Sequence, residues 1–165
     1  MRVFTAVLIV LTFFSGCSAT GNMETVLDNY DIPVSSVVNN ITFTLPEGAS
    51  EAVLGTENGS SLYLCDGYSV SVSAMAGGDL EQTIRDVTGF EKAELTVMAT
   101  TEEACKRYTC AWTALGEGIE QICKAVILDD GTSHFVVSVM CDYNAAGELN
   151  QEMNSILDSV SLHAG

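Results

Sequence analysis

Basic side chains are scarce in this chain of 165 residues. The sequence holds six Lys and Arg against 22 Asp and Glu, so its formal net charge is −16. Attraction to the phosphate backbone of DNA or RNA requires clustered Lys and Arg. We therefore expect no nucleic-acid partner, and we expect the excess acids to form a solvated surface that keeps the protein soluble.

Histidine and the familiar catalytic motifs are also missing or rare. The only two His, His134 and His163, lie in a strand-like segment and near the end of the chain. No Gly-x-Ser-x-Gly, His-Glu-x-x-His or Cys-x-x-Cys sequence occurs. These absences remove the usual markers of serine hydrolases, zinc proteases and thioredoxin-like enzymes. We expect no metal ion, no cofactor and no catalytic residue that the sequence can identify.

Calcium is the remaining metal that so many carboxylates suggest. The best loop spacing starts at Asp142, with Asn144 and Gly147 at the third and sixth positions. Ala146 and Met153 stand at the fifth and twelfth positions, where an EF-hand loop needs oxygen ligands. The sequence therefore predicts no calcium loop.

A hydrophobic run long enough to span a membrane is absent as well. The apolar-rich stretch from Val3 to Phe14 has 12 residues, whereas a transmembrane helix needs about 20. It follows the basic start Met1-Arg2 and is followed by small residues. This order is typical of an export signal, and we assign residues 1–16 to a signal peptide.

The end of that signal, Phe14-Ser15-Gly16-Cys17, resembles the lipobox of bacterial lipoproteins. In that family the Cys is linked to diacylglycerol and becomes the mature N-terminus. The match departs from the usual pattern at Phe14, where a branched aliphatic residue is common. The resemblance implies lipidation of Cys17 and a stable lipid anchor, on the extracytoplasmic face of a cell membrane. The alternative is an ordinary cleaved signal with a coincidental Cys.

The rest of the chain has the composition of a folded protein. It is 47% hydrophobic with a mean hydropathy of +0.27, too apolar for a disordered chain. Residues 17–40 are weakly periodic and contain several turn-forming residues. We interpret 17–40 as the lipidated Cys and a tether, and 41–165 as a single globular α+β domain.

Alternating hydrophobicity and turn residues predict mainly strands in this domain. Strands are expected at 41–45, 52–55, 62–65, 68–73, 95–99, 107–115, 119–128 and 133–141. A helix is expected between Asp79, with Gln82 three residues on, and Gly89. A closing amphipathic helix is expected after a cap at Asn144.

The last strands carry apolar residues on both faces, so we expect the sheet to be covered on both faces. The predicted fold class is α+β, an antiparallel sheet of about five to seven strands covered by helices. The extended segment Ile41–Leu45 leads into Pro46-Glu47-Gly48, and a hairpin, a helix, a three-strand meander and a final helix follow. This order resembles PsbP-like and DcrB-like domains. The resemblance implies an α/β/α sandwich, common among bacterial lipoproteins, and it carries over no site residue.

Five Cys follow Cys17, and export makes disulfides plausible for them. If Gly116 and Glu117 are the central residues of a type II′ turn, Cys110 faces Cys123 across a hairpin. That register makes Cys110 and Cys123 a candidate disulfide and places Trp112 on the same sheet face. The alternative is that these thiols are small buried hydrophobes that never oxidise.

These observations favour a lipid-anchored extracytoplasmic module that binds a protein, a peptide or a small ligand. The membrane is its partner through the N-terminal lipid. The alternative is an extracytoplasmic hydrolase or redox enzyme that uses carboxylates or a reactive thiol. Cys105 is the thiol considered, because the adjacent Lys106 and Arg107 could lower its pKa. Against this, neighbours on a strand point to opposite faces, so Lys106 need not approach Cys105.

Overall fold

The computed structural model describes residues 35–38, 40–52 and 60–162. Residues 1–16, which we assigned to a signal peptide, Cys17 and His163 lie outside the described residues, so the structure does not test the predictions for them. Within the described ranges the chain forms strands, two α-helices and one short 3₁₀ helix, η1.

The strands are β1 (Ser35–Val38), β2 (Ile41–Thr44), β3 (Ser50–Ala52), β4 (Ser61–Leu64), β5 (Tyr68–Ala76), β6 (Met98–Thr101), β7 (Lys106–Gly116), β8 (Ile119–Asp129), β9 (Ser133–Asp142) and β10 (Ser161–Leu162). The helices are α1 (Leu80–Thr88), η1 (Lys92–Glu94) and α2 (Ala146–Ser159). Neither α-helix of the described residues is long and apolar enough to cross a membrane.

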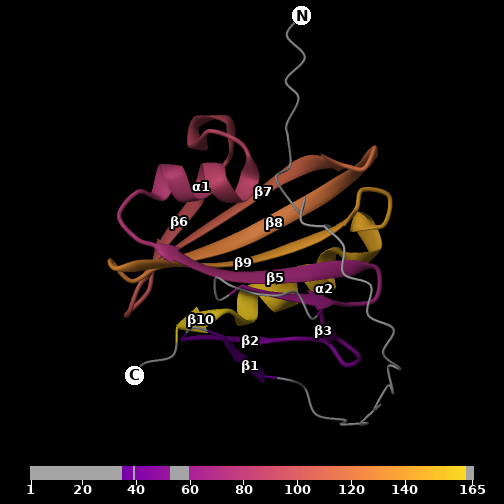
Figure 1. The fold of residues 1–165 in the computed structure, drawn as a ribbon, viewed down its shortest axis with the longest axis horizontal. Coiled ribbons are helices and arrows are strands. Elements are labelled where there is room, and N and C mark those ends of the chain that lie inside the picture. The colour runs from indigo at the N-terminus through magenta and orange to yellow at the C-terminus, as the bar shows by residue number, and fades with distance from the viewer. Residues whose placement is uncertain (1–34, 39, 53–59, 163–165) are drawn as a thin grey trace, which may run out of the picture.

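Seven strands form one sheet in the order β3-β4-β5-β9-β8-β7-β6, and every neighbouring pair is antiparallel. Helix α1 lies on one face of this sheet and α2 on the other (Figure 1). A second sheet, β1-β2-β10, lies beyond α2, and its central strand contacts that helix (Figure 1). The predicted fold class, an antiparallel α+β sheet covered by helices, is confirmed.

Helix α1 begins and ends where the sequence predicts. The side chain of Asp79 accepts a hydrogen bond from the backbone N–H of Gln82 at 3.0 Å. Gly89 ends the helix in the left-handed conformation, with φ of 77°, which costs a residue without Cβ little. Both ends therefore depend on residues next to the helix in sequence.

Several boundaries differ from the predictions; β6, for example, begins at Met98 and not at residue 95. Residues Ser35–Val38, which we placed in the tether, pair with β2 as β1, so the folded unit begins before residue 41. Asn144 does not cap α2, because its backbone and side-chain N–H groups donate to the carboxylate of Asp142. Ala145 takes the N-cap position without a side-chain hydrogen bond.

The predicted turn between β7 and β8 is wrong by one residue. Gly116 pairs with Ile119, and the central residues Glu117 and Gly118 both have positive φ, 50° and 83°. This is the geometry of a type I′ turn, which needs positive φ at both central positions. Gly118, and not Gly116, is therefore the glycine of the turn, at its second central position. Every residue pair between β7 and β8 shifts accordingly.

The shift changes the partners of the two cysteines without changing their face. Cys110 pairs with Ala125, and Cys123 pairs with Trp112. Both thiols are free, so the predicted disulfide is not formed. Diagonal positions of this kind are about 7–8 Å apart at Cα, beyond what a disulfide spans without backbone movement. Trp112 shares the face of Cys110, as expected.

The core is divided between the two faces of the sheet. The larger cluster lies on the α2 side and joins the sheet to α2 and β2, with Phe43, Val137 and Met153 completely buried. The smaller cluster lies under α1 and contains Ile84, Ile127 and Val136. Each helix is thus attached by its own apolar cluster.

Candidate functional site

A groove of about 530 Å³ lies beside α2. Its floor is the part of the sheet that α2 does not cover, with Met98 of β6 and Thr109 of β7. Asn154 and Asp158 of α2 form one wall. The volume lies within the range of small-molecule sites, so we call this groove the α2 groove.

Lys124 is the central charged residue of the α2 groove. It lies on β8, opposite Ala111 of β7, and its Nζ donates to Asn150 Oδ1 at 2.6 Å and to Asn154 Oδ1 at 2.7 Å. The two Asn are four residues apart and so share one face of α2. Among the described residues no carboxylate lies within ion-pair distance of this ammonium group. Its charge is therefore oriented by neutral amides and is not neutralised.

Arg107 occupies the other end of the α2 groove and has a structural role. Its guanidinium donates to Glu102 Oε1 and to the carbonyl oxygens of Leu157, at 3.3 Å, and Val160. Those carbonyls belong to the last turn of α2, where a cation offsets the negative end of the helix dipole. Arg107 thereby fixes the end of the helix that forms the wall of the groove.

Apolar side chains make up the rest of the lining. Val126 and Leu157 are buried parts of the core that reach the floor and wall, and Met98 at the sheet edge is 63% exposed. An exposed Met is flexible and adapts its shape to different apolar groups. The α2 groove therefore offers a cation, hydroxyl and amide groups, and an apolar surface together.

Cys105 does not have the low pKa that a reactive thiol needs. The pKa of this thiol is raised to about 11, first by burial and then by its hydrogen bond to Glu102 Oε2, at 3.5 Å. Arg107 acts in the opposite direction but does not prevail. The alternative in which neighbouring cations activate Cys105 therefore finds no support, because the carboxylate of Glu102 lies beside the thiol.

A second polar group, which sequence reasoning missed, lies beneath α1. His134 is 1% exposed, and its Nδ1 is hydrogen-bonded to Thr83 Oγ1 at 2.6 Å. Its Nε2 lies 3.8 Å from Asp129 Oδ1. The residue types are those of a catalytic triad, but Thr83 is 4% exposed and lines neither the α2 groove nor the shallow pocket near Asp129. We interpret the group as a polar attachment of α1 to β9.

The candidate calcium loop has no ligand geometry in the structure. The Oδ1 atom of Asp142 already accepts hydrogen bonds from Asn144. Within 35–38, 40–52 and 60–162, no three His, Cys, Asp or Glu side chains lie close enough together to hold a metal ion.

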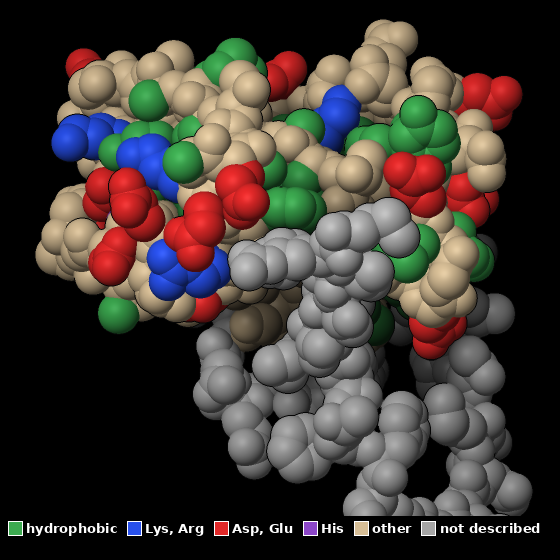
Figure 2. Space-filling model, turned by 90° about the horizontal axis from the view of Figure 1, so that it is seen from above, with side chains coloured by type: hydrophobic (Ala, Val, Ile, Leu, Met, Phe, Trp, Pro, Cys, Tyr) green, Lys and Arg blue, Asp and Glu red, His purple; other side chains and the backbone are tan. Residues whose placement is uncertain are grey.

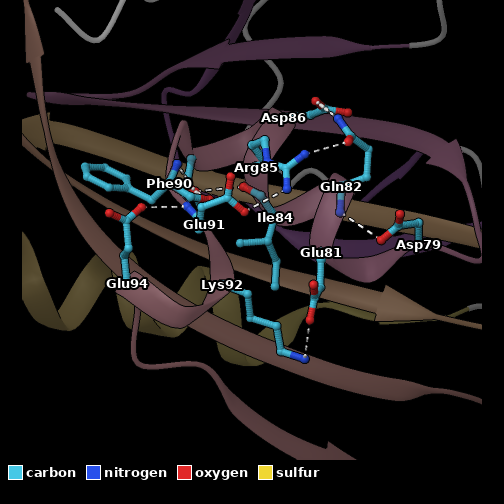
Figure 3. A network of polar contacts seen from close by, with 11 residues as sticks. Asp79, Glu81, Gln82, Ile84, Arg85, Asp86, Phe90, Glu91, Lys92 and Glu94 are labelled. Carbon is cyan, nitrogen blue, oxygen red and sulfur yellow. Dashed lines mark hydrogen bonds and ion pairs between the residues drawn. The ribbon is translucent and has the colours of Figure 1, made fainter. Parts of the chain in front are cut away.

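The surface of α1 and η1 carries a network of charged side chains (Figure 3). Arg85 pairs with Glu91 at 2.7 Å, and Lys92 lies 4.0 Å from Glu81. Figure 2, which looks down on the α1 side, shows acidic and basic side chains intermingled at the left and hydrophobic ones further along the face. These cations have carboxylate partners, in contrast to Lys124.

One sequence feature could have indicated the α2 groove. Lys124 interrupts an otherwise apolar run in β8, and Asn150 and Asn154 lie four residues apart on the closing helix. The sequence does not show that these three side chains meet, because they belong to elements joined only by the packing of α2 on the sheet.

Comparisons with known proteins show the fold. No protein-family model and no curated protein sequence matches the chain. The solution structure of cyanobacterial PsbP (CyanoP) from Synechocystis sp. PCC 6803 is similar, with a TM-score of 0.58 and 13% identity, over 90% of this chain and 98% of that one.

Two more distant structures share this fold. One is a protein of Bacteroides thetaiotaomicron VPI-5482, with a TM-score of 0.50 and 13% identity, over 76% of this chain and 46% of that one. The other is the Saccharomyces cerevisiae Ran-binding protein Mog1p, with a TM-score of 0.50 and 12% identity, over 74% and 90%. The domain has a PsbP-like fold, as the resemblance implied.

Proposed function

We propose that the protein is a lipid-anchored, extracytoplasmic binding module that holds its ligand in the α2 groove. The single observation that carries the proposal is Lys124, an ammonium group oriented by two amides and facing a cavity of about 530 Å³. A cation that neutral amides orient toward a cavity, and that no carboxylate of the described residues neutralises, is available to an acceptor on a ligand.

The anchor is supported by the sequence at the N-terminus. The short apolar stretch, the small residues and Cys17 favour a lipoprotein exported from the cytoplasm. A lipid at Cys17 would hold the module at the membrane, where its groove can meet a ligand. The partners are then the membrane, through the lipid, and a peptide or small molecule in the groove.

Mass spectrometry of the mature N-terminus tests the anchor. The expected result is a Cys17 carrying diacylglycerol, in a protein that partitions into the detergent phase, and a Cys17→Ser variant that stays unprocessed or is released. An unmodified Cys17, or cleavage several residues downstream, contradicts the anchor and leaves the groove to be tested separately.

Filling the α2 groove tests the binding site. Ala111 is exposed on the floor, opposite Lys124, so Ala111→Trp places a large ring in the cavity without entering the core. Ala99→Trp is the matched control. Ala99 is also exposed, but it pairs with Tyr108, which packs on the α1 side.

The mature chain in detergent is screened by ligand-observed NMR against small carboxylates, amines, sugars, dipeptides and apolar rings. Hits that are lost in Ala111→Trp and kept in Ala99→Trp support the proposal. Hits that survive Ala111→Trp, or the absence of any hit, overturn it.

A further inference from the structure

We infer that the ligand of the α2 groove is a short peptide with free ends, whose terminal carboxylate binds Lys124 and whose terminal amine binds Asp158. The inference rests on the proposed function, because it names the ligand class of the same groove. It depends on the two charged groups of the lining that the protein leaves without a partner of opposite charge.

The positive group is Lys124. An ammonium group has three N–H donors, and Asn150 and Asn154 accept two of them. The other basic residue of the lining, Arg107, is already bound to Glu102 and to the end of α2. One N–H of Lys124 and its full charge are therefore available to an acceptor in the cavity.

The negative group is Asp158. It is exposed on the groove wall, and its side chain has no hydrogen-bond or ion-pair partner among the residues that the structure describes. The other carboxylate of the lining, Glu102, is occupied by Arg107 and the Cys105 thiol. The groove therefore has one uncommitted charge of each sign.

The geometry of α2 gives an approximate spacing of the two groups, and with it the length of the ligand. Asn154, which binds Lys124, lies four residues before Asp158 on α2, a rise of about 6 Å along the helix axis. An extended dipeptide spans about 7 Å at most. Its side chains would then lie against Met98, Val126 and Leu157, the apolar part of the lining.

The chemistry of the groove disfavours a phosphate. Phosphate recognition usually recruits Arg forks or several cations, and the one Arg of the lining is engaged. Two carboxylates in the same cavity and a net charge of −16 also oppose a dianion. A single carboxylate balanced by an amine avoids both difficulties.

Three probes that differ only at their ends test the inference by calorimetry on the mature chain in detergent. They are the dipeptide Ala-Leu, its C-terminal amide and its N-acetyl derivative. Loss of a hydrogen bond to a charged group should weaken binding about tenfold or more for each blocked end. Equal affinity of all three probes overturns the inference.

Variants connect each end of the peptide to its residue. Lys124→Gln should remove the preference for the free carboxylate over the amide, and Asp158→Asn should remove the preference for the free amine. Lys106→Gln is the control, since Lys106 is exposed and lies outside the groove. Because each preference is a ratio between two probes on one variant, partial loss of stability does not mimic the result. Unchanged preferences overturn the assignment.

The two proposals fail in different ways. If other fragments bind and are lost in Ala111→Trp while no dipeptide binds, the peptide inference is overturned and the binding groove stands. If nothing binds in the groove, both are overturned.

Discussion

The two faces of the sheet are covered in different ways. On the α2 side, a helix of 14 residues and a second sheet share one large cluster of buried residues with the main sheet. On the α1 side, a helix of nine residues rests on a cluster of three buried residues, joined by the Thr83–His134 hydrogen bond and a surface network of charges. The first face is attached by apolar burial, and the second combines little apolar area with polar contacts.

This difference indicates which parts of the molecule stabilise the fold and which parts can move. Burial of apolar area is the dominant stabilising contribution in folding, so the α2 face should unfold with the whole domain. Regions with few buried apolar contacts open at lower free energy. We expect α1 to detach before global unfolding, and the α2 groove to be built on the more rigid side.

The largest expected effect comes from the α2 face. Phe43 of β2 is completely buried against Tyr63 and the α2 cluster. Phe43→Ala should lower the free energy of unfolding by about 3–5 kcal/mol, because it leaves a cavity in the core. Urea denaturation measures this value. Leu115→Ala is the control, since Leu115 is 67% exposed and its truncation should change little.

The matching change on the α1 face should cost less. Ile84 is completely buried between α1 and the sheet, in the smaller cluster. Ile84→Ala should lower the free energy of unfolding by about 2–3 kcal/mol, the low end for a buried aliphatic residue, because the short helix can shift into the space. A loss equal to that of Phe43→Ala would contradict the proposed difference between the faces.

Hydrogen exchange gives a second comparison of the same two variants. In Ile84→Ala, the amides of α1 should exchange faster while those of α2 stay protected. In Phe43→Ala, protection should fall across the whole sheet. Equal loss of protection in both helices for both variants would indicate a single cooperative unit.

The polar attachment of α1 should contribute less again. Thr83→Val keeps the shape of the side chain but leaves the buried Nδ1 of His134 without its hydrogen-bond partner. An unsatisfied buried polar atom costs about 1–3 kcal/mol. Thr113→Val on β7 is the control, because Thr113 is exposed. If both variants unfold at the same urea concentration, His134 does not need this bond.

Ionisation of the buried thiols of the α1 face should affect the free energy of unfolding only at alkaline pH. Burial raises the pKa of Cys110 and Cys123 from 9.0 to about 11. Between these values the unfolded chain loses the protons that the folded chain keeps, so stability falls as the pH rises from about 9 to 11. A Cys110→Ala, Cys123→Ala double variant should show a shallower loss over this interval in thermal unfolding. Identical curves would show that the two thiols ionise alike in the folded and the unfolded states.

The smallest effect is expected at the surface network of α1. The side chains of Arg85 and Glu91 are 46% and 56% exposed, and solvent screens an exposed ion pair. Arg85→Gln should leave the thermal midpoint unchanged within error, in low salt and in high salt. A clear drop in low salt alone would show that the pair in Figure 3 holds α1 and η1 together.

Features that depend on near neighbours could be predicted from the sequence. The N-cap at Asp79 and the left-handed Gly89 involve residues within a few positions of each other. The same holds for the hairpin at Asp66 and Gly67, where β4 returns as β5. The apolar residues on both faces of β8 and β9 also predicted correctly that both faces are covered.

The β7–β8 turn shows where local information ends. Gly116-Glu117-Gly118 can form a two-residue turn with either Gly in a central position. Since shifting the turn by one residue leaves every side chain on its face, the hydrophobic pattern does not distinguish the two registers. In the structure, the pairing of β7 with β8 and of β8 with β9 along their whole lengths selects the register in which Glu117 and Gly118 are the central turn residues.

The sequence by itself determined the acidic surface, the types of the elements, the ends of α1 and the two-sided sheet, because composition and local spacing specify these features. Only the tertiary structure decided which polar side chains meet. Lys124 reaches Asn150 and Asn154 across 26 and 30 positions, and His134 reaches Thr83 across 51. Such pairs form only when a helix packs on a sheet at a particular position and angle. The buried apolar side chains of both elements together determine that position and angle.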